Sequence, residues 1–477
     1  MNTLTIAWLA LPFFIGFISY LLPQLDRYLS LGVAIASLGY SLLLFAEPPL
    51  TLQLLDSFGV TLQLDPLAGF FILTNALVTA AVILYCWQSG RTAFFYMQMI
   101  ILHGSVNAAF ACTDFISLYV ALEVISIAAF LLIAYPRTDR SIWVGLRYLF
   151  TSNIAMLFYL MGAVLVYQAT HSFAFAGLAA APPEAIALIC LGLLVKGGIF
   201  VSGLWLPLTH SESETPVSAL LSGVVVKAGV LPLARFALLI EEIDPLIRAF
   251  GVGTALLGVG YAVFEKDTKR MLAFHTVSQL GFILAAPEVG GFYALTHGLV
   301  KSALFLIAAK LPSRNFKELQ HQPMPRSIWI ALVMASFSIS GFPLLSGFGA
   351  KVLTMKSLLP WQVIGMNLAA LGTAISFAKF IFLPHENREK PEKYQLGFWA
   401  AVVLLIGGLA VANGVYYEAY TVANIIKPLG TIALGWLLYQ FVFRQIVIKL
   451  PRLLEQFDQL VGMMSVMLVL LFWMVLA

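Results

Sequence analysis

Titratable side chains interrupt several stretches of this sequence that are otherwise apolar enough to lie in lipid. They are one glutamate, one histidine and five lysines: Glu123, Lys196, Lys227, His297, Lys301, Lys351 and Lys379. A charge at the centre of a bilayer costs about 2.5–3.5 kcal/mol on insertion scales. A chain that keeps seven such groups is therefore expected to use them. The simplest use is a path along which protons or ions move through a membrane.

Lys196 follows a long apolar run and has no acidic neighbour in the sequence. A lysine buried without a partner is driven toward its neutral form, so it can take up and release a proton. Gly197, Gly198 and Gly203 weaken the helix beyond it, and a loosened helix at membrane depth is tolerated where it lines a cavity. The alternative is a lysine that snorkels from a helix end, but about ten apolar residues flank it on either side.

Glu123 is the only acidic residue well inside an apolar stretch of residues 93–240. A carboxylate near Lys196 would hold that lysine charged, and separating the two would favour proton release. The two residues are therefore a candidate switch. A static buried ion pair or a protonated glutamic acid is the structural alternative, because buried pairs alone are weak evidence of function.

A second group of candidates comprises Lys227, His297 and Lys301. His297 and Lys301 are four residues apart, so they share one face of a helix. Histidine titrates near pH ~6.5 and suits a relay between lysines. A histidine that is simply satisfied within the core is the alternative for His297.

Four further residues are weaker candidates. Lys379 lies about five residues before Pro384 and is either an exit site or a snorkelling lysine. Lys351 and Lys356 lie near a glycine-rich piece and are expected at the membrane interface. His275 is expected near the cytoplasmic surface, where we assign it a structural role.

Composition places these residues in a polytopic membrane protein. The chain has 477 residues, of which 61% are hydrophobic and 10% are charged, whereas soluble domains carry about 25% charged residues. About sixteen apolar stretches are long enough to cross a bilayer as helices. No loop could hold a soluble domain, so a nucleotide or redox site would have to lie on another chain.

Sites for cofactors and metals are not expected on this chain. Cys86, Cys112 and Cys190 all lie in apolar stretches, and there is no CxxC pair. The sequence has no GxxxxGK phosphate loop, no zinc-ligand spacing and no HExxH. A nucleic-acid partner is not expected either.

The apolar stretches fall into four groups along the chain. The first group, in residues 1–90, begins with a stretch that lacks the features of a cleaved signal peptide. The predicted spans are 5–22, 28–46, 65–87, 93–112, 114–135, 143–168, 185–206, 217–240, 246–264, 270–286, 290–311, 327–345, 361–383, 396–412, 421–443 and 457–477. The groups are 1–90, 91–242, 243–394 and 395–477.

The two middle groups are weakly alike in layout. Trp205-Leu206-Pro207 comes after Lys196, and Phe382-Leu383-Pro384 comes after Lys379; each is followed by a polar run. Interrupted helices at corresponding places in two halves are typical of transporters built from inverted repeats. The alternative is that these prolines simply end helices at the membrane surface.

Charge distribution predicts the orientation. If the spans alternate, one side receives most basic residues: Arg27, Arg91, Arg137, Arg140, Lys266, Lys269, Arg270, Arg314, Lys317, Arg326, Arg388, Lys390, Lys393, Arg444, Lys449 and Arg452. The other side receives mostly acidic residues, with Arg248 as the exception: Glu47, Asp56, Glu184, Glu241, Glu242, Asp244, Glu288 and Glu418. The positive-inside rule puts the basic side in the cytoplasm and both termini outside. This parity requires that residues 345–359 do not cross separately.

Several sequence runs, taken in order, match a known family pattern. The matching runs are Leu118-Tyr119-Val120-Ala121-Leu122-Glu123, Lys196 with Trp205-Leu206-Pro207 and Thr215-Pro216-Val217-Ser218-Ala219-Leu220, Lys227-Ala228-Gly229-Val230 with Arg235, Glu265-Lys266-Asp267-Thr268-Lys269-Arg270-Met271-Leu272-Ala273, His297 with Lys301, and Gly341-Phe342-Pro343 with Ser346-Gly347-Phe348-Gly349-Ala350-Lys351. From about Asp65 to Lys379 the chain resembles the antiporter-like subunits shared by Mrp-type multisubunit cation/proton antiporters and the membrane arm of respiratory complex I.

The resemblance implies a fold and a role for each candidate. It implies an all-α polytopic membrane protein with about 14–16 transmembrane helices and two inverted five-helix repeats, each with one discontinuous helix. Glu123 and Lys196 look like the family's glutamate–lysine pair. Lys227, with His297 and Lys301, looks like the central relay, and Lys379 looks like the terminal lysine.

The chain also departs from the family pattern. Val201 and Gly203 stand where family members often carry proline and histidine, so the break after Lys196 is expected to rely on glycines. Some complex I subunits carry glutamate at the position we assign to Lys379. The region beyond about Lys393 matches poorly and lacks a long amphipathic helix. The compact length is similar to that of the D-type component of an Mrp antiporter.

We therefore expect a proton-translocating subunit of a multisubunit cation (Na⁺)/H⁺ antiporter. Its partners would be other hydrophobic subunits, H⁺, Na⁺ and the lipid of a bacterial plasma membrane, with a thylakoid membrane as the alternative. The second hypothesis is a proton-pumping membrane-arm subunit of a complex I-like oxidoreductase driven by other chains. A third is a stand-alone carrier for an organic solute, for which no polar substrate pocket is evident in the sequence.

Overall fold

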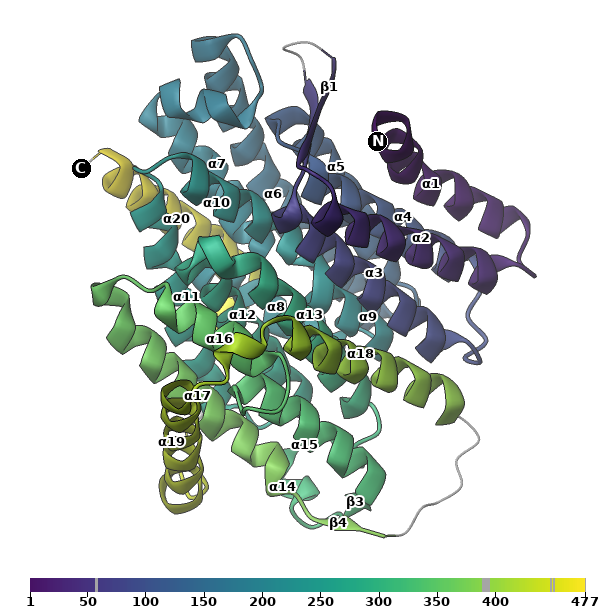
Figure 1. The fold of residues 1–477 in the computed structure, drawn as a ribbon, viewed down its shortest axis with the longest axis vertical. Coiled ribbons are helices and arrows are strands. Elements are labelled where there is room, and N and C mark those ends of the chain that lie inside the picture. The colour runs from purple at the N-terminus through teal and green to yellow at the C-terminus, as the bar shows by residue number, and fades with distance from the viewer. Residues whose placement is uncertain (56–58, 388–394, 447, 449–450, 477) are drawn as a thin grey trace.

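Long apolar helices make up most of the chain because its apolar runs are long enough to cross a bilayer. The structure, a computed structural model, describes residues 1–55, 59–387, 395–446, 448 and 451–476. Within these residues, fourteen helices are long and apolar enough to cross a membrane. The predicted all-α polytopic membrane fold is confirmed (Figure 1).

The N-terminal group forms three helices and a β-hairpin. Its elements are α1 (Asn2–Leu21), α2 (Asp26–Ala46), β1 (Leu50–Leu55), β2 (Gly59–Leu64) and α3 (Pro66–Cys86). The antiparallel hairpin pairs Leu50 with Leu64, in a segment that the sequence places between two spans. It is fixed to the bundle by Asp114, which accepts the N–H of Thr61 (2.8 Å) and caps the next helix at Ser117 (2.7 Å).

The next group contains one interrupted helix and one helix with a π-helical turn. Its elements are α4 (Ala93–Ala111), α5 (Phe115–Ile133), α6 (Asp139–Thr170), α7 (Pro183–Gly197), α8 (Leu206–Glu212), α9 (Thr215–Leu220) and α10 (Lys227–Leu239). A 3₁₀ helix, Phe200–Trp205, joins α7 to α8, and the π-helical turn, Leu221–Val225, joins α9 to α10.

A second interrupted helix follows in the third group. Its elements are α11 (Asp244–Phe264), α12 (Thr268–Ala285), α13 (Gly290–Ala308), α14 (Phe316–Leu319), β3 (Met324–Pro325), α15 (Arg326–Ser340), α16 (Gly347–Lys356), α17 (Val363–Ile381) and β4 (His385–Glu386). Residues 388–394, at the predicted boundary with the last group, lie outside the described residues.

The position of this second interruption corrects the layout comparison made from the prolines. The break lies between α15 and α16, where Gly341 has φ +84°. Pro384 follows the end of α17 and therefore ends a helix, while Pro207 lies in the first turn of α8, beyond the first break. Proline alone is misleading because its ring is well tolerated in the first turn of a helix and just past its end.

The last three helices lie apart from one another around the bundle. They are α18 (Gln395–Val415), α19 (Val422–Leu438) and α20 (Phe457–Leu476). α18 packs against α3 and α13, α19 against α17, and α20 against α7. In Figure 1, α19 and α20 are well separated along the left side of the view.

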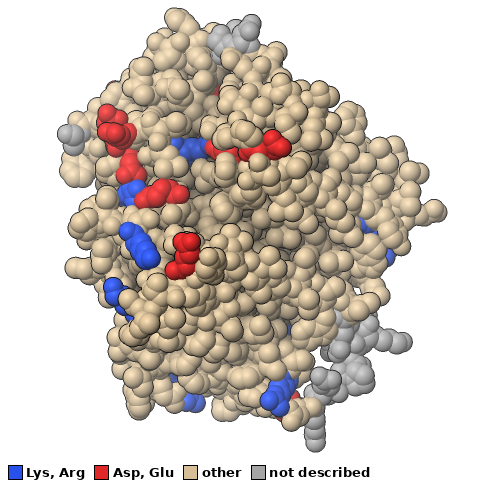
Figure 2. Space-filling model, in the orientation of Figure 1, with Lys and Arg blue, Asp and Glu red and all other residues tan. Residues whose placement is uncertain are grey.

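The surface agrees with a membrane location. Figure 2 shows only small groups of charged side chains on a face that is otherwise uncharged. Large apolar side chains are exposed along the outer helices, for example Phe14 (69%), Ile364 (76%) and Val411 (75%). Exposed apolar faces of this kind are stable in lipid rather than in water.

Candidate functional site

The first interrupted helix positions Lys196. α7 ends one residue after it, because Gly198 adopts the left-handed conformation (φ +69°). A side chain at Gly203 would meet the carbonyl oxygen of Gly198 at 2.1 Å, so the tight turn requires glycine there too. Trp205 closes the break by donating its indole N–H to the carbonyl of Val195 (2.9 Å). The predicted glycine-based break is confirmed.

Lys196 is held by hydroxyl and carbonyl oxygens. Its ammonium group donates to the carbonyl of Leu122 (2.9 Å) and to the hydroxyls of Ser152 (2.6 Å) and Ser126. The lysine is 4% exposed. Burying an ammonium group is costly unless its protons are satisfied, so these three acceptors make the charged form tolerable.

Glu123 lies beside Lys196 without binding it directly. Its carboxylate interacts electrostatically with the lysine, but no ion pair between the two occurs in the described part of the chain. One oxygen, Oε1, is buried and has no hydrogen-bond partner among the described residues. The carboxyl and ammonium groups are thus close enough to interact, without a direct hydrogen bond between them.

A π-helical turn creates the acceptors for Lys227. The widened turn frees carbonyl groups that an α-helix would use, and the lysine donates to those of Ser222 (3.3 Å) and Gly223 (2.5 Å). Gly223 also lets α13 approach, because a side chain there would meet Ser302 Oγ at 2.2 Å. This close packing brings α13, with His297 and Lys301, against Lys227.

His297 and Lys301 are both buried on α13, as their spacing predicted. Lys301 donates to the carbonyl of Leu272 on α12. Neither ring nitrogen of His297 has a partner among the described residues, and the charges of Lys227 and Lys301 both act on this ring. The structure therefore brings Lys227, His297 and Lys301 together.

Lys196 and Lys227 are linked through their helices. Gly197 and Gly229 meet where α7 and α10 cross: a side chain at Gly229 would lie 2.5 Å from the nitrogen of Gly197. The two lysines are one and two residues away from this crossing. No hydrogen bond joins them in the described residues, so a proton passing between them needs side-chain motion or water.

Lys351 is buried, contrary to the expectation that it lies at the interface. It is 6% exposed and donates to the carbonyl of Ser340, across the second break (3.2 Å). A side chain at Gly341 would meet Lys351 Cδ at 2.8 Å, so the glycine makes room for the lysine stem. Lys356, one and a half turns later, is exposed as expected.

A cavity of about 240 Å³ reaches Lys351 from between α16, α17 and α19. Its lining is mainly apolar, and its polar side chains besides Lys351 are Ser340, Lys356, Asn367, Asn424, Lys427 and Thr431. The hydroxyl of Ser340 has no partner among the described residues. This cavity gives Lys351 a connection toward the end of the bundle where Lys356 is exposed.

His275 lies between Lys301, which belongs with Lys227 and His297, and the two later lysines, Lys351 and Lys379. It is completely buried on α12, and neither ring nitrogen has a partner in the described part of the chain. The charges of Lys301, Lys351 and Lys379 all act on it. Its expected place near the surface is wrong: it lies seven residues into α12, or about 10 Å from the start of that helix.

Lys379 occupies the end of α17 and is only partly buried. Its ammonium group donates to the carbonyls of Ala262 (3.1 Å) and Glu265 (2.8 Å) at the end of α11. The sequence leaves open whether this lysine is an exit site or snorkels from a helix end. In the structure, its hydrogen bonds to these carbonyls place its ammonium group at the C-terminal end of α11. A lysine is also favoured there by the partial negative charge of a helix C-terminus.

Sequence reasoning missed His210, a further titratable side chain near Lys227 and Lys301. His210, in α8, is completely buried, and its ring interacts with the backbone of Leu206. The charges of Lys301, Lys269 and Lys227 act on it, and Lys269 donates to the carbonyl of Ser213 (2.7 Å). The polar run Thr209–Glu214 was the available signal.

Comparisons with known proteins agree with this arrangement. Residues 112–376 match the family described as NADH:quinone oxidoreductase/Mrp antiporter, TM. The chain belongs to this family. The matched residues contain both interrupted helices and Lys351, and they end three residues before Lys379.

Two curated relatives come from an oxidoreductase and from an antiporter. The N-type component of NADH-quinone oxidoreductase from Desulforudis audaxviator is 30% identical over 426 residues, covering 78% of this chain and 84% of the relative. The D-type component of the Na(+)/H(+) antiporter from Alkalihalophilus pseudofirmus is 27% identical over 451 residues, covering 85% and 91%.

Two solved structures share the fold. The Mrp complex of a Dietzia species aligns with a TM-score of 0.78 at 24% identity, covering 98% of this chain and 59% of that one. The archaeal membrane-bound sulfane sulfur reductase aligns with a TM-score of 0.77 at 22% identity, covering 92% and 99%. Both likenesses support the fold of this chain.

Proposed function

We propose that this chain is the proton-translocating membrane subunit of a multisubunit cation/H⁺ antiporter, with Na⁺ as the expected cation. The observation that carries the proposal is the series of buried basic side chains that runs between the two interrupted helices. Lys196 stands at one end of this series and Lys351 at the other. Buried ionisable groups inside membranes are expensive and therefore mark ion pathways.

In this proposal protons pass along Lys196, Lys227, His297 and Lys301 and leave toward Lys379. Glu123 sets the charge of Lys196. We add His275 and Lys351, because His275 interacts with Lys301, Lys351 and Lys379 alike. Like charges in a poorly screened interior repel strongly, so protonation at one site favours release from the next.

Two buried imidazoles support a relay of this type. His275 and His297 are buried without hydrogen-bond partners among the described residues, and buried polar groups in native proteins are nearly always satisfied by protein or ordered water. We therefore infer that water molecules bridge these imidazoles to the neighbouring lysines.

The organisation of the two middle groups is also part of the proposal. We infer that residues 91–242 and 243–394 are two inverted repeats, because each contains one helix interrupted at a left-handed glycine, Gly198 and Gly341. The basic loops would face the cytoplasm of a bacterial cell. Both termini would lie outside the plasma membrane.

Hydrophobic partner subunits are supported by the exposed face of α5. Glu123 is only partly buried there, between the exposed Val120 (54%) and Ile127 (51%). A carboxylate close to lipid is costly, so a neighbouring membrane protein is expected to cover this face.

The test uses inside-out vesicles that contain the chain with its native neighbours. The vesicles are acidified by respiration, and NaCl is added while a pH-sensitive dye reports the lumenal pH. Antiport predicts rapid Na⁺-dependent alkalinisation that Lys196→Ala abolishes. Wild-type exchange by this variant would refute the assigned path. Transport by the purified chain alone would instead favour a single-chain carrier.

A second candidate function is the membrane-arm subunit of a redox-driven pump. It is favoured by the 30% identity to the N-type component of an NADH-quinone oxidoreductase. A mild-detergent pull-down of the tagged chain separates the two functions. Co-purifying flavin or iron–sulfur subunits would favour the redox pump, whereas only small hydrophobic partners and related antiporter-like chains would favour the antiporter.

A further inference from the structure

Glu455, just before α20, lies at the end of the bundle where Lys379 is found: it contacts Arg270, which also binds Glu265, and the carbonyl of Glu265 binds Lys379. α19 packs on α17 and α20 packs on α7. We call residues 444–456 the C-terminal linker; all but 447, 449 and 450 are described. The linker lies outside the residues that match the family.

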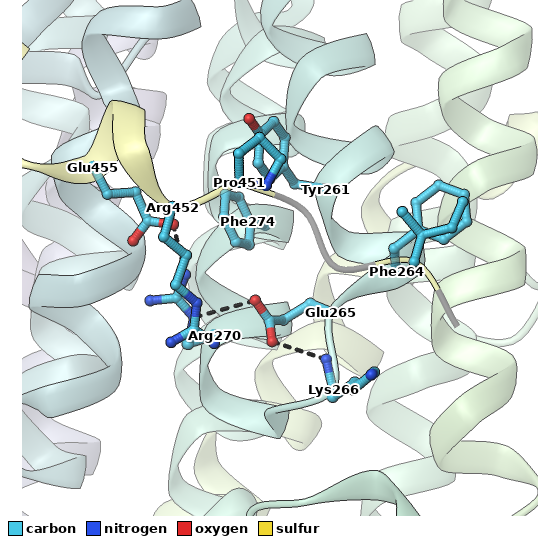
Figure 3. Close-up of a pocket in the computed structure, with 10 residues that line it drawn as sticks. Tyr261, Phe264, Glu265, Lys266, Arg270, Phe274, Pro451, Arg452 and Glu455 are labelled. Atoms are coloured by element: carbon cyan, nitrogen blue, oxygen red, sulfur yellow. Dashed lines mark hydrogen bonds and ion pairs between the residues drawn. The ribbon is translucent and has the colours of Figure 1, made fainter. Parts of the chain in front are cut away.

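Glu455 of the linker is bound to the core through Arg270. Arg270 Nη2 lies 2.6 Å from Glu455 Oε1, and Arg270 Nε lies 3.1 Å from Glu265 Oε2. The guanidinium group therefore joins one carboxylate of the core to one carboxylate of the linker (Figure 3). The side chains of Arg270 and Glu455 are only 7% and 8% exposed, so solvent screens this contact weakly.

Arg147 on α6 also faces Glu455. Its side chain is 8% exposed, its Nε and Nη2 atoms have no partner among the described residues, and the charge of Glu455 acts on it. Glu455 is thus shared between a cation of the first middle group and a cation of the second. Removing its charge would leave Arg147 facing no carboxylate of the linker and would leave Arg270 paired with Glu265 alone.

Glu265 extends this contact to Lys379. Its carboxylate accepts the N–H groups of Lys266 (2.8 Å) and Asp267 (3.2 Å), and its backbone carbonyl accepts the ammonium of Lys379 (2.8 Å). Burial alone would raise the pKa of Glu265, but Arg270 and the two N–H groups lower it below its usual range. Glu265 is therefore ionised at neutral pH.

A cavity of about 300 Å³ lies under the linker. Tyr261, Phe264 and Phe274 form one wall, Pro451 and Arg452 of the linker form another, and Glu265, Arg270 and Glu455 point into it (Figure 3). Because Glu265 both lines this cavity and holds Lys379, it connects the cavity to the end of the proposed path.

We propose that Glu455 is a positioning residue for proton transfer: by holding Arg270, it fixes Glu265 and thereby Lys379 beside the cavity that forms the cytoplasmic mouth of the path. This inference rests on the proposed function. Glu455 acts through Arg270 and does not itself contact any of the lysines of the path.

The test compares Glu455→Gln, which keeps the shape and removes the charge, with Glu455→Asp and with Asp458→Asn. Asp458 is an exposed acid three residues away and serves as the matched control. All variants are measured in the full chain within its native assembly, and immunoblotting checks the amount of the chain in the membrane.

We expect Glu455→Gln to lower the antiport rate about tenfold, as the loss of a buried charge partner does. Glu455→Asp should retain most of the rate, and Asp458→Asn all of it. Half-maximal rate should also move to lower cytoplasmic pH in Glu455→Gln, because less negative charge then faces Arg147, Lys266, Arg452 and Lys379. An unchanged rate, or a lower rate with an unchanged pH profile, overturns the proposal.

A labelling experiment separates this inference from the proposed function, because it needs no transport. Phe264→Cys places a thiol in the cavity wall, and the native cysteines are buried. Adding Glu455→Gln should speed its reaction with a maleimide supplied from the cytoplasmic side about threefold or more, as the linker loosens. An unchanged labelling rate overturns the positioning role even if antiport is absent.

Discussion

At the scale of single residues, the lysines of this chain are stabilised by oxygens that carry no formal charge. Lys196, Lys227, Lys301, Lys351 and Lys379 all donate to backbone carbonyls. A carbonyl satisfies an ammonium proton without fixing the charge of the lysine, as a buried carboxylate would. Each lysine can therefore lose and regain its proton while its surroundings stay in place.

The first residue-scale prediction concerns Glu123 and Lys196. Replacing either by alanine should reduce Na⁺/H⁺ exchange by about 10²-fold, the usual worth of one proton-transfer group, while the chain still reaches the membrane. Lys317→Ala, which removes an exposed lysine outside the proposed path, is the control. Dye-based antiport assays on vesicles with equal amounts of the chain give the comparison, and normal exchange by Glu123→Ala would contradict it.

The second prediction separates two candidates for the end of the path. Lys351 lies at a helix break within the family match, whereas Lys379 lies at a helix end outside it. We therefore expect Lys351→Ala to impair antiport at least as strongly as Lys379→Ala. Initial rates over a range of Na⁺ concentrations check this order. The reverse order would return the terminal role to Lys379.

Hydropathy explains which of these residues could be predicted from the sequence and which could not. Lys196, Lys227, His297 and Lys301 stand out because each interrupts an apolar run. His210 and His275 lie in more polar segments, which look the same in sequence whether they face solvent or the interior. The sequence places Lys351 at the interface because hydropathy cannot distinguish a short helix buried after a break from one at the surface.

At the scale of elements, two glycines decide where the lysines point. Gly198 and Gly341 both have left-handed conformations, which cost other residues about 1–2 kcal/mol. Both are also crowded: a side chain would meet Leu206 Cδ1 at 2.6 Å in the first case and Lys351 Cδ at 2.8 Å in the second. Glycine at each break therefore sets the position of the lysine beside it: Lys196 in the first case and Lys351 in the second.

The third prediction tests these breaks. Gly198→Ala and Gly341→Ala should each destabilise the chain by about 1–2 kcal/mol through backbone strain. Gly341→Ala should also lower antiport because it displaces Lys351. Gly260→Ala is the matched control, since nothing lies within 4 Å of a side chain there. Thermal unfolding in detergent measures stability, and equal melting of all three variants would argue against strained breaks.

Elements were predicted unevenly from the sequence. All sixteen apolar stretches contain helices, because long apolar runs have no other stable form in lipid. The hairpin of β1 and β2 was missed, since strands of six residues give little periodic signal. The π-helical turn at Leu221–Val225 was also missed, because nothing in its composition distinguishes it from an α-helix.

At the scale of the whole molecule, the proposed orientation of the chain in the membrane can be tested by labelling. The fourth prediction is that Arg137→Cys reacts with a membrane-impermeant maleimide only from the cytoplasmic side. Glu241→Cys should react only from outside. Both positions are exposed, and the native cysteines are buried. Labelling intact cells and inside-out vesicles makes the comparison, and the opposite pattern would invert the proposed topology.

Glu123 on the outer face of α5 has a consequence for biogenesis. Half of the proposed switch lies at the perimeter of the chain, beside side chains that face lipid. If the path is as proposed, we expect a copy inserted without its neighbours to leave this carboxyl group next to lipid and therefore to conduct protons poorly. A partly lipid-facing carboxyl group would also give membrane quality control a feature by which to remove such copies. Assembly of the complex would then be the event that switches conduction on.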